Sequence, residues 1–348
     1  MELRGLDPEA VTRPSVLARR AARSRWQAVG WLVLRRLGFV LPVLVVVAVG
    51  IFLLGAASPF DPIYQYYGVE IFSASAADIA RVRAQLGLDD GVLVQLWRWL
   101  TGIFSGELGI SRSFRQPVTE VIAQRLPWTL LLVSVGLVIA IAIALVVGVL
   151  AAWRQGGLID RFVTAMAHAL EGIPSFLLGL GAIALFALSL RWVPVAGLTS
   201  PGAPASFDQV AYHLIMPAMV LGVSQTPWLI LHLRASLLTA LAEDHVAGAR
   251  ARGLPEWRVV LRHALPTALL PFVTLLGARV PELVTGAVLV EEIFSWPGVA
   301  EAVVTAALAV DFPMLAALGV LSTAAVLLGS LLADVAVVLA DPRVAADG

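Results

Sequence analysis

The sequence lacks cysteine and lysine altogether and carries little charge of either sign. All 24 basic residues among its 348 are arginine, and charged residues make up 14% of the chain, against about a quarter in soluble domains. Without cysteine, the chain can form neither disulfide bonds nor thiolate metal sites. Without lysine, it can form neither a Schiff base nor the phosphate-binding loop in which a lysine follows the glycines, so it cannot bind ATP in that way.

Hydrophobic residues are what the chain has in excess. They account for 59% of it, and the mean hydropathy is +0.88. A chain this apolar can bury that surface only in a lipid bilayer. The formal net charge is zero, so the charge balance gives no indication of a nucleic-acid partner. The five histidines are not spaced like metal ligands, and we expect no catalytic centre, metal site or cofactor on the chain itself.

Six segments are long and apolar enough to cross a bilayer, which takes about 20 residues of helix. We therefore expect an all-α membrane protein with six transmembrane helices. The first expected span, residues 37–57, belongs to an uncharged stretch too long for the apolar part of a cleavable signal peptide. The other expected spans are residues 128–153, 163–190, 212–233, 268–290 and 313–340.

Arginine is concentrated in alternate links between the expected spans. Residues 1–36 hold eight arginines against three acidic residues, and residues 234–262 hold five against three. Residues 291–311, by contrast, have no arginine and four acidic residues. Because arginine-rich links stay in the cytoplasm, we expect both termini inside and the long link 58–127 outside.

These expectations divide the chain into five regions. We expect a cytoplasmic arginine-rich segment, a first transmembrane helix, a small external cap, a transmembrane core and a cytoplasmic tail, over residues 1–36, 37–57, 58–127, 128–340 and 341–348 respectively. Within the cap, hydrophobic spacing predicts helices near residues 76–88 and 92–100. Trp97 and Trp99 of the second helix are typical of a membrane interface.

The link before the fifth span, residues 234–266, contains the pattern of a short polar helix. Asp244 suits the first turn of a helix, and Gly253 is a stop signal for which we expect a left-handed conformation. Small residues form one face between these two: Ala247, Gly248, Ala249 and Ala251. Such a face permits close approach of a partner. A capped surface helix that only joins two spans would explain the pattern equally well.

This link resembles the cytoplasmic loop of binding-protein-dependent ABC permeases, whose pattern is Glu-Ala-Ala-x3-Gly-x9-Ile-x-Leu-Pro. The chain keeps the spacing of that pattern at Ala249, Gly253, Leu265 and Pro266, and it departs from the pattern at Ala247, Gly248 and His263. The surrounding residues, with Asp244 before the small face and Arg250 within it, are similar to the dipeptide, oligopeptide and nickel branch of the family.

Further segments resemble the same branch, in the same order along the chain. They are residues 86–89, 106–111, 125–130, 173–176, 213–218, 292–299 and 341–343, and together they cover about residues 30–343. Where this sequence has Glu107, the family usually has aspartate. Each motif alone is weakly specific, whereas their order and spacing together are strongly so.

The resemblance implies a permease subunit with the type I ABC importer fold, in a bacterial inner membrane. It would form half of a path for di- and oligopeptides by alternating access, as a heterodimer with a second homologous permease. Two ATPase subunits, which bind ATP and magnesium, would dock on the loop, and an external binding protein would deliver cargo. Nickel, metal chelates or another small solute are the alternative cargo. The implied coupling residues are Asp244, Ala247, Gly248, Ala249, Arg250, Arg252, Gly253, Leu265 and Pro266.

Charges and prolines inside the expected spans are the remaining candidates. Arg279 and Glu282 share a helix face, and they line the translocation path, contact the second permease, or satisfy only each other. Glu171, near the expected start of the third span, is a weaker candidate for the path, because solvent or Arg161 would satisfy it as well. Prolines in a helix remove a hydrogen bond, and the hinge candidates are Pro174, Pro217 and Pro281.

Two other classes of membrane protein fit the sequence less well. An ion-coupled secondary transporter predicts inverted repeats, and no internal symmetry relates the six expected spans. A membrane-embedded enzyme needs a catalytic constellation. Ser224, for example, has no histidine and aspartate at suggestive positions.

Overall fold

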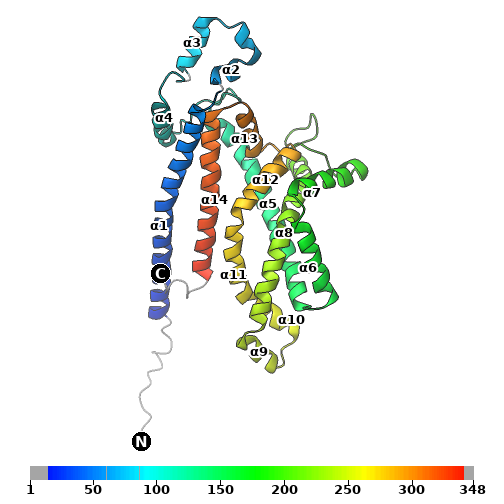
Figure 1. Ribbon diagram of the computed structural model, residues 1–348. Helices are drawn as coiled ribbons and strands as arrows, with labels where there is room; N and C mark the ends of the chain where they lie inside the picture. Colours follow the sequence, from blue (N-terminus) through cyan, green and yellow to red (C-terminus); the bar gives the residue numbers. More distant parts are fainter. Residues whose placement is uncertain (1–14, 60, 86, 341–348) are drawn as a thin grey trace.

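In the computed structural model, which describes residues 15–59, 61–85 and 87–340, the chain folds into helices and forms no strand within those ranges. Five helices are long and apolar enough to cross a membrane, and a sharply bent helix pair makes a sixth if it is counted as one span. These observations confirm the expected all-α membrane class. Figure 1 shows the long helices side by side, with a small helical cap at one end. The α-helices are α1 (Ser15–Ala56), α2 (Pro62–Tyr67), α3 (Ala76–Gln85), α4 (Val92–Ser105), α5 (Val118–Trp153), α6 (Leu158–Glu171), α7 (Ser175–Ala182), α8 (Phe207–Leu241), α9 (Asp244–Ala251), α10 (Glu256–Val259), α11 (Leu265–Ala278), α12 (Val280–Ile293), α13 (Val299–Leu308) and α14 (Phe312–Ala340).

Three long helices extend beyond their expected spans. α1 already begins at Ser15, inside the segment expected to precede the first span, and α5 and α8 also start earlier than expected. Pro127 lies within α5 and Pro217 within α8 without ending either helix. Neighbouring helices can compensate a hydrogen bond that proline removes. Hydropathy marks only the apolar stretch of a helix, so the polar ends of these helices fell outside the expected bounds.

The expected third span, residues 163–190, is a bent pair and not one continuous helix. The axes of α6 and α7 meet at 101° across a short break. Gly172 and Pro174 lie in that break, and Pro174 is the residue directly before α7. Proline disfavours helical geometry in the residue before it, so α6 cannot simply continue. A π-helical turn, Ile183–Ser189, then completes the pair.

The expected fifth span, residues 268–290, is also divided. α11 and α12 are separated at Arg279, and Pro281 lies in the first turn of α12. Proline is favoured at that position, since the N–H that it lacks would have no helical partner anyway. The apolar helix long enough to cross the membrane is instead Glu256–Gly277, which begins before the predicted span and ends before Arg279.

α5 and α8 cross closely in the centre of the bundle. A Cβ added to Gly222 of α8 would lie 2.9 Å from the carbonyl oxygen of Gly136 on α5, so this close approach requires glycine. Along α8, the buried side chains of Leu221 and Leu233 extend the packing to α12 and α11 respectively. This helix pair therefore forms the framework against which the two divided spans pack.

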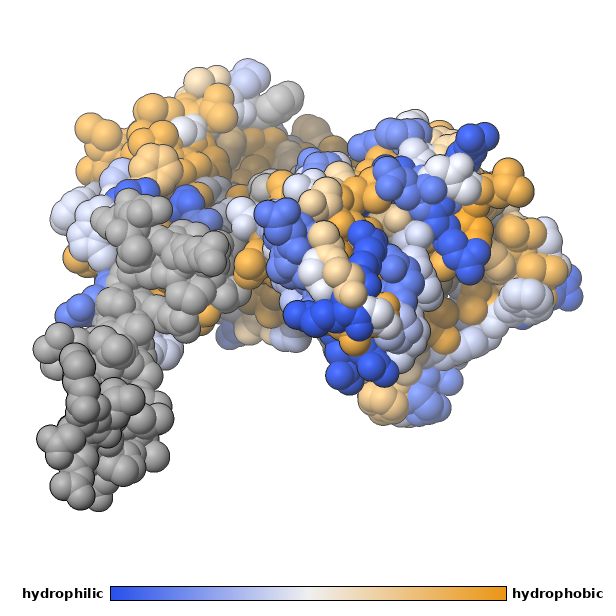
Figure 2. Space-filling view, turned by 90° about the horizontal axis from the view of Figure 1, so that it is seen from below, coloured by the Kyte–Doolittle hydropathy of each residue, from blue (hydrophilic) through white to orange (hydrophobic). Residues whose placement is uncertain are grey.

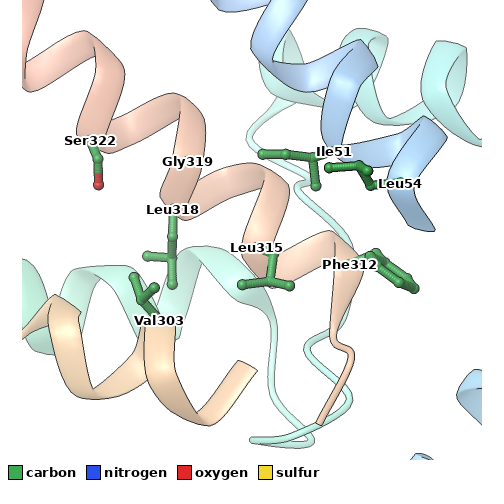
Figure 3. Close-up of a pocket in the computed structure, with 8 residues that line it drawn as sticks. All are labelled: Ile51, Leu54, Val303, Phe312, Leu315, Leu318, Gly319 and Ser322. Carbon is green, nitrogen blue, oxygen red and sulfur yellow. The ribbon is translucent and has the colours of Figure 1, made fainter. Parts of the chain in front are cut away.

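α1 and α14 form a second pair at one side of the bundle (Figure 1). An ion pair between Arg36 and Asp334 joins the two helices. Near the cap, α1, α13 and α14 leave an apolar hollow of about 300 Å³. Figure 3 shows the side chains that line it, among them Ile51, Leu54, Val303, Leu315 and Leu318. Ser322 is the one polar side chain in this lining, so the hollow offers little that could orient a polar ligand.

The segment expected as a cap gathers at one end of the bundle, where α2 and α3 stand clear of the long helices (Figure 1). Arg83 of α3 donates a hydrogen bond of 2.6 Å to Asp61, which caps α2 by accepting from the N–H of Ile63 at 3.0 Å. Trp97 of α4 is exposed as expected. Trp99, two residues on and therefore on another face of the helix, is instead buried against Phe52 of α1, with ring centroids 5.7 Å apart.

Some predictions lie outside the described residues. They are the tail 341–348 with its motif at 341–343, the first 14 residues of the arginine-rich segment 1–36, and Leu86 of the motif at 86–89.

Candidate functional site

The predicted docking helix exists as α9, and it has an inner and an outer face. Val246 and Ala249 are completely buried, in the core cluster that also contains Leu237 and Val259. Ala247 and Gly248 are exposed, as are Ala251, Asp244, Arg250 and Arg252. The expected face of four small residues is therefore wrong for Ala249, because a helix turns by about 100° per residue and carries Ala249 inward with Val246.

α9 ends at Ala251, and Gly253, the predicted stop signal, follows in the expected left-handed conformation. Its φ angle is +73°, and a Cβ at this position would meet no atom within 4 Å. The N–H of Gly253 donates to the carbonyl of Arg250 at 2.9 Å, and the N–H of Leu254 donates to Ala249 at 3.4 Å. These two bonds form the Schellman motif. Glycine is thus required here by backbone conformation alone.

Hydrogen bonds tie α9 to the chain that follows it. The guanidinium of Arg250 donates to the carboxylate of Glu256 at 2.7 and 3.3 Å, and this hydrogen bond raises the pKa of Arg250. His245 Nε2 lies 3.0 Å from the carbonyl oxygen of His263. His263 belongs to a π-helical turn, Val260–Ala264, that leads directly into α11. We refer to residues 242–264, between α8 and α11, as the α9 segment.

Leu265 and Pro266, the last of the implied coupling residues, form the first turn of α11. Pro266 is exposed and Leu265 packs beside the core cluster beneath α9. Seen from this end of the molecule, the surface over α9 and α10 is largely hydrophilic, with hydrophobic surface on the flanking long helices (Figure 2). The α9 segment therefore presents a polar, shallow surface outside while its inner face is part of the helix bundle.

A pocket of about 360 Å³ brings together the charged residues singled out in the spans. Glu171, Arg279 and Glu282 all line it, together with Trp228, Ser224 and Gln225. Arg279 forms an ion pair with Glu282, and its guanidinium carbon lies 4.1 Å from the ring centroid of Trp228. The side chain of Arg279 is 18% exposed and that of Glu282 is 58% exposed. The expected pair is therefore formed, and it opens onto the pocket.

Glu171 lies where the sequence did not place it. It is the last residue of α6, at the bend, and not near the start of a span. Its carboxylate lies 3.9 Å from Nδ1 of His168, and it interacts electrostatically with Arg279 across the pocket. Within the described residues, no hydrogen bond or ion pair joins Glu171 to Arg161, which is ten residues earlier on α6. The alternative that Arg161 satisfies Glu171 is thus not supported.

The hinge candidates differ in their relation to this pocket. The bend at Pro174 and the division before Pro281 both border it, since Ser175 and Arg279 are lining residues. Pro217 is buried within continuous α8, away from the lining. Both helix breaks thus lie beside the pocket, with Glu171 at the end of α6 and Arg279 between α11 and α12.

Comparison with known protein families agrees with this membrane architecture. Residues 144–346 match the family described as binding-protein-dependent transport system inner membrane component, and residues 29–133 match the N-terminal domain of that family. The chain belongs to this family. It is a multi-pass inner-membrane component of a transport system. This confirms the resemblance drawn from the motifs and favours the permease interpretation over a secondary transporter.

Relatives of this inner-membrane component match most of its length. A putative peptide permease of Brucella suis is 34% identical, over 89% of this chain and 98% of its own. The oligopeptide transport system permease protein AppB of Bacillus subtilis is 34% identical, over 90% and 98%. The probable D,D-dipeptide transport system permease protein DdpB of Escherichia coli is 36% identical, over 91% and 98%.

The permease also contains buried polar contacts that the sequence did not reveal. Asp160 at the start of α6 accepts two hydrogen bonds from Arg234 of α8, at 2.5 and 2.8 Å, and one from the N–H of Gly156 at 2.8 Å. Asp311 before α14 is fully buried and accepts from the hydroxyl of Ser111 at 2.6 Å. In the sequence, Asp160 and Asp311 could be recognised only as acidic residues beside apolar runs. Their partners could not be predicted, because Arg234 and Ser111 lie far away in the sequence.

Proposed function

We propose that this permease imports short peptides, that its α9 segment receives a partner ATPase, and that the pocket at Arg279 lies on the translocation path. One observation carries the proposal: α11 begins at the α9 segment and ends at the pocket. A displacement at one end of this helix is transmitted to the other, because a packed helix moves as a rigid element.

The inner face of α9 gives this linkage its strength. Val246 and Ala249 are buried in a core cluster that also contains Ala268 and Phe272 of α11. α9 itself contacts α8, α10 and the π-helical turn Val260–Ala264, which leads into α11. α11 has 14 residues, which corresponds to about 20 Å of helix. Close-packed interiors transmit displacement and do not absorb it. A partner that pushes on Gly248 therefore moves α11 and, with it, Arg279.

The pocket has chemistry suited to a peptide with free ends. Arg279 offers a guanidinium for a carboxylate, whereas Glu171 and Glu282 offer carboxylates for an ammonium group. Trp228 and Pro227 add apolar surface for side chains. The volume of about 360 Å³ is within the range of small-molecule sites. The relatives that carry peptide or dipeptide permease in their names support this cargo over metal chelates.

The partners follow from the same proposal. The permease pairs with a second homologous permease as a heterodimer, two ATPase subunits bind ATP and magnesium, and an external binding protein delivers the peptide. The chain supplies no ATPase site and binds no cofactor, in keeping with its lack of the phosphate-loop lysine. Asp244 and Arg252 are exposed beside the small residues of α9 and supply charges for docking.

Reconstitution of the four-part transporter in liposomes tests the cargo. We expect uptake of a radiolabelled dipeptide. This uptake should need ATP on the side of the membrane where the ATPase subunits dock, and the binding protein on the opposite side. Uptake driven by a proton or sodium gradient without ATP would contradict the proposal. Uptake of a nickel chelate without uptake of any dipeptide would overturn the peptide cargo while leaving the ATPase coupling intact.

We further propose that both termini and the α9 segment are cytoplasmic and the cap is external. The absence of native cysteine makes single-cysteine labelling clean on this subunit. In intact cells, Gln116→Cys, exposed at the cap end, should react with a membrane-impermeant maleimide. Gln155→Cys, exposed in the link between α5 and α6, should react only after lysis. The opposite pattern would reverse the orientation.

A further inference from the structure

Arg112, in the link between α4 and α5, is a buried cation with unused hydrogen-bond donors. Its relative exposure is 5%. Within the described part of the chain, its Nε and Nη1 atoms are buried and have no hydrogen-bond partner. Burial lowers the pKa of Arg112, against the attraction of Asp311 and Asp61. Arginine nevertheless stays protonated in proteins, so the guanidinium remains charged and lacks acceptors.

The acidic residues near Arg112 are already engaged elsewhere. Asp311 accepts from Ser111 and from both the N–H and the hydroxyl of Ser113. Asp61 accepts from Arg83 and from the N–H of Ile63. Asp311 also accepts from the N–H of Met314 at 3.3 Å. In the described residues, no hydrogen bond joins Arg112 to either carboxylate. Burying a charge without a hydrogen-bonded partner is costly, so the native protein is expected to place an acceptor beside Arg112.

Arg112 lines a partly open pocket of about 400 Å³ at the cap end of the molecule. The pocket lies between the end of α1, the cap helices α3 and α4, and Phe312 at the start of α14, whose ring is visible beside Leu54 in Figure 3. Arg83 and Asp90 stand on its wall, and Asp90 is paired with Arg98 at 2.7 Å. The pocket is separate from the one at Arg279.

We propose that this pocket binds the carboxylate of a small solute, with the guanidinium of Arg112 as the hydrogen-bond donor. A hydrogen bond between a guanidinium and a carboxylate is charge-assisted and therefore stronger than one between neutral groups. One buried arginine compensates one negative charge. The carboxylates of Asp61 and Asp90 on the same wall disfavour a doubly charged anion such as phosphate. The remaining volume accommodates the body of a molecule as large as a dipeptide.

Ligand protection of an introduced cysteine tests this site in the assembled transporter, independently of transport. Ala56 lines the pocket and is exposed, whereas its neighbour Ala57 is exposed outside the lining. In Ala56→Cys, we expect alanyl-alanine to slow maleimide labelling roughly tenfold at ten times its dissociation constant, by mass action. Acetate should protect at higher concentration. Labelling of Ala57→Cys should not change.

Variation of the ligand and of Arg112 identifies the contact. Alanyl-alanine amide, which lacks the carboxylate, should not protect Ala56→Cys. Arg112→Lys should weaken protection about tenfold and Arg112→Met should abolish it, because a charged hydrogen bond is lost in part or entirely. Unchanged labelling of Ala57→Cys in both Arg112 variants shows that the cap remains folded.

Three results would overturn the proposal. They are equal protection by the free and the amidated dipeptide, no protection by any small carboxylate, and protection only when the binding protein is present. The comparison between free acid and amide uses the native Arg112, so it decides the question even if the Arg112 variants fail to fold. Loss of peptide transport with intact protection would count against the proposed cargo path and not against this site.

Discussion

The two ends of α11 present opposite surfaces. At the α9 segment, the outer face carries small side chains such as Gly248, and Arg250 is satisfied by Glu256 of the same segment. At the pocket, two helix breaks leave Glu171, Arg279 and Glu282 around an open volume. The first surface suits a protein partner that approaches the backbone closely, and the second suits a small charged solute.

This difference fits the two roles that we propose for one inner-membrane component. The α9 segment has a fixed conformation, held by a Schellman motif and by buried Val246 and Ala249. The pocket lies between divided elements, because α6 meets α7 at a 101° bend and α11 is separated from α12 at Arg279. Transmission of a displacement through α11 requires a rigid segment at the end that receives the partner and a divided structure at the end that borders the pocket.

The largest effect is expected from Gly253→Val. A β-branched residue at a φ of +73° is strained, so the chain after α9 is misdirected and the partner ATPase no longer engages α11. We expect the transporter to insert and to pair with its second permease, yet to lose stimulation of ATP hydrolysis by loaded binding protein. Nanodisc ATPase assays with and without binding protein measure this.

Gly156→Val is the matched control for Gly253→Val. Gly156 has a φ of +74° and, like Gly253, no atom within 4 Å of an added Cβ, but it lies between α5 and α6. The backbone strain is the same, but it lies outside the α9 segment. Stimulation of ATP hydrolysis by loaded binding protein should therefore survive in this variant. If both variants lose stimulation, or if both retain it, the α9 segment has no special role and is an ordinary connector.

The contrast between the two faces of α9 gives the next effect. Gly248→Trp places bulk on the open face, where an added Cβ meets nothing, and should block ATPase co-purification while the permease itself stays folded. Ala249→Trp places the same bulk in a fully buried position and should lower the yield of folded permease, because overpacking strains a close-packed core. Normal yield and normal coupling in both variants would exclude the assigned faces.

A graded effect is expected at the pocket. Arg279→Ala should reduce peptide uptake about tenfold or more, the consequence of losing a charged hydrogen bond to cargo, with little change in assembly yield. Glu282→Ala should reduce uptake less, because Glu282 is half-exposed and Arg279 keeps its contact with Trp228. If the pair is only structural, assembly yield should instead fall in each single variant and recover in the double variant.

The sequence was most informative where structure is local. The helix over residues 244–251, its stop at Gly253 and the two cap helices depend on residues close together in the chain, so propensity and capping rules predict them. The bend at Pro174, the inward side of Ala249 and the buried partners of Asp160 and Asp311 depend on packing between distant segments. Asp160 and Arg234 are an example: their pairing follows from the crossing of α6 and α8, which no local pattern specifies.

The ion pair between Asp160 and Arg234, which joins distant segments, should contribute to the stability of the fold. Asp160 is 5% exposed at its side chain and bonds Arg234 through both carboxylate oxygens. Asp160→Asn leaves a partly buried guanidinium without a counter-charge, and we expect a loss of about 3 kcal/mol in the free energy of unfolding. Thermal unfolding in detergent, with Asp208→Asn at an exposed helix start as the control, measures this loss. A shift no larger than in the control would mean that the pair contributes nothing.

The smallest effect is expected at the exposed ion pair between Arg250 and Glu256. Arg250 and Glu256 are 43% and 45% exposed at their side chains, so solvent screens their attraction despite the 2.7 Å contact. Glu256→Gln keeps the shape of the side chain and one acceptor, and it should cost less than about 1 kcal/mol. Stimulated ATP hydrolysis should stay near the native level, because the buried face of α9 and the Schellman motif hold the segment without this pair. A loss of coupling in Glu256→Gln at unchanged stability would instead make the pair part of the docking surface. Coupling would then depend on the charge of this pair and not on the backbone conformation of the α9 segment.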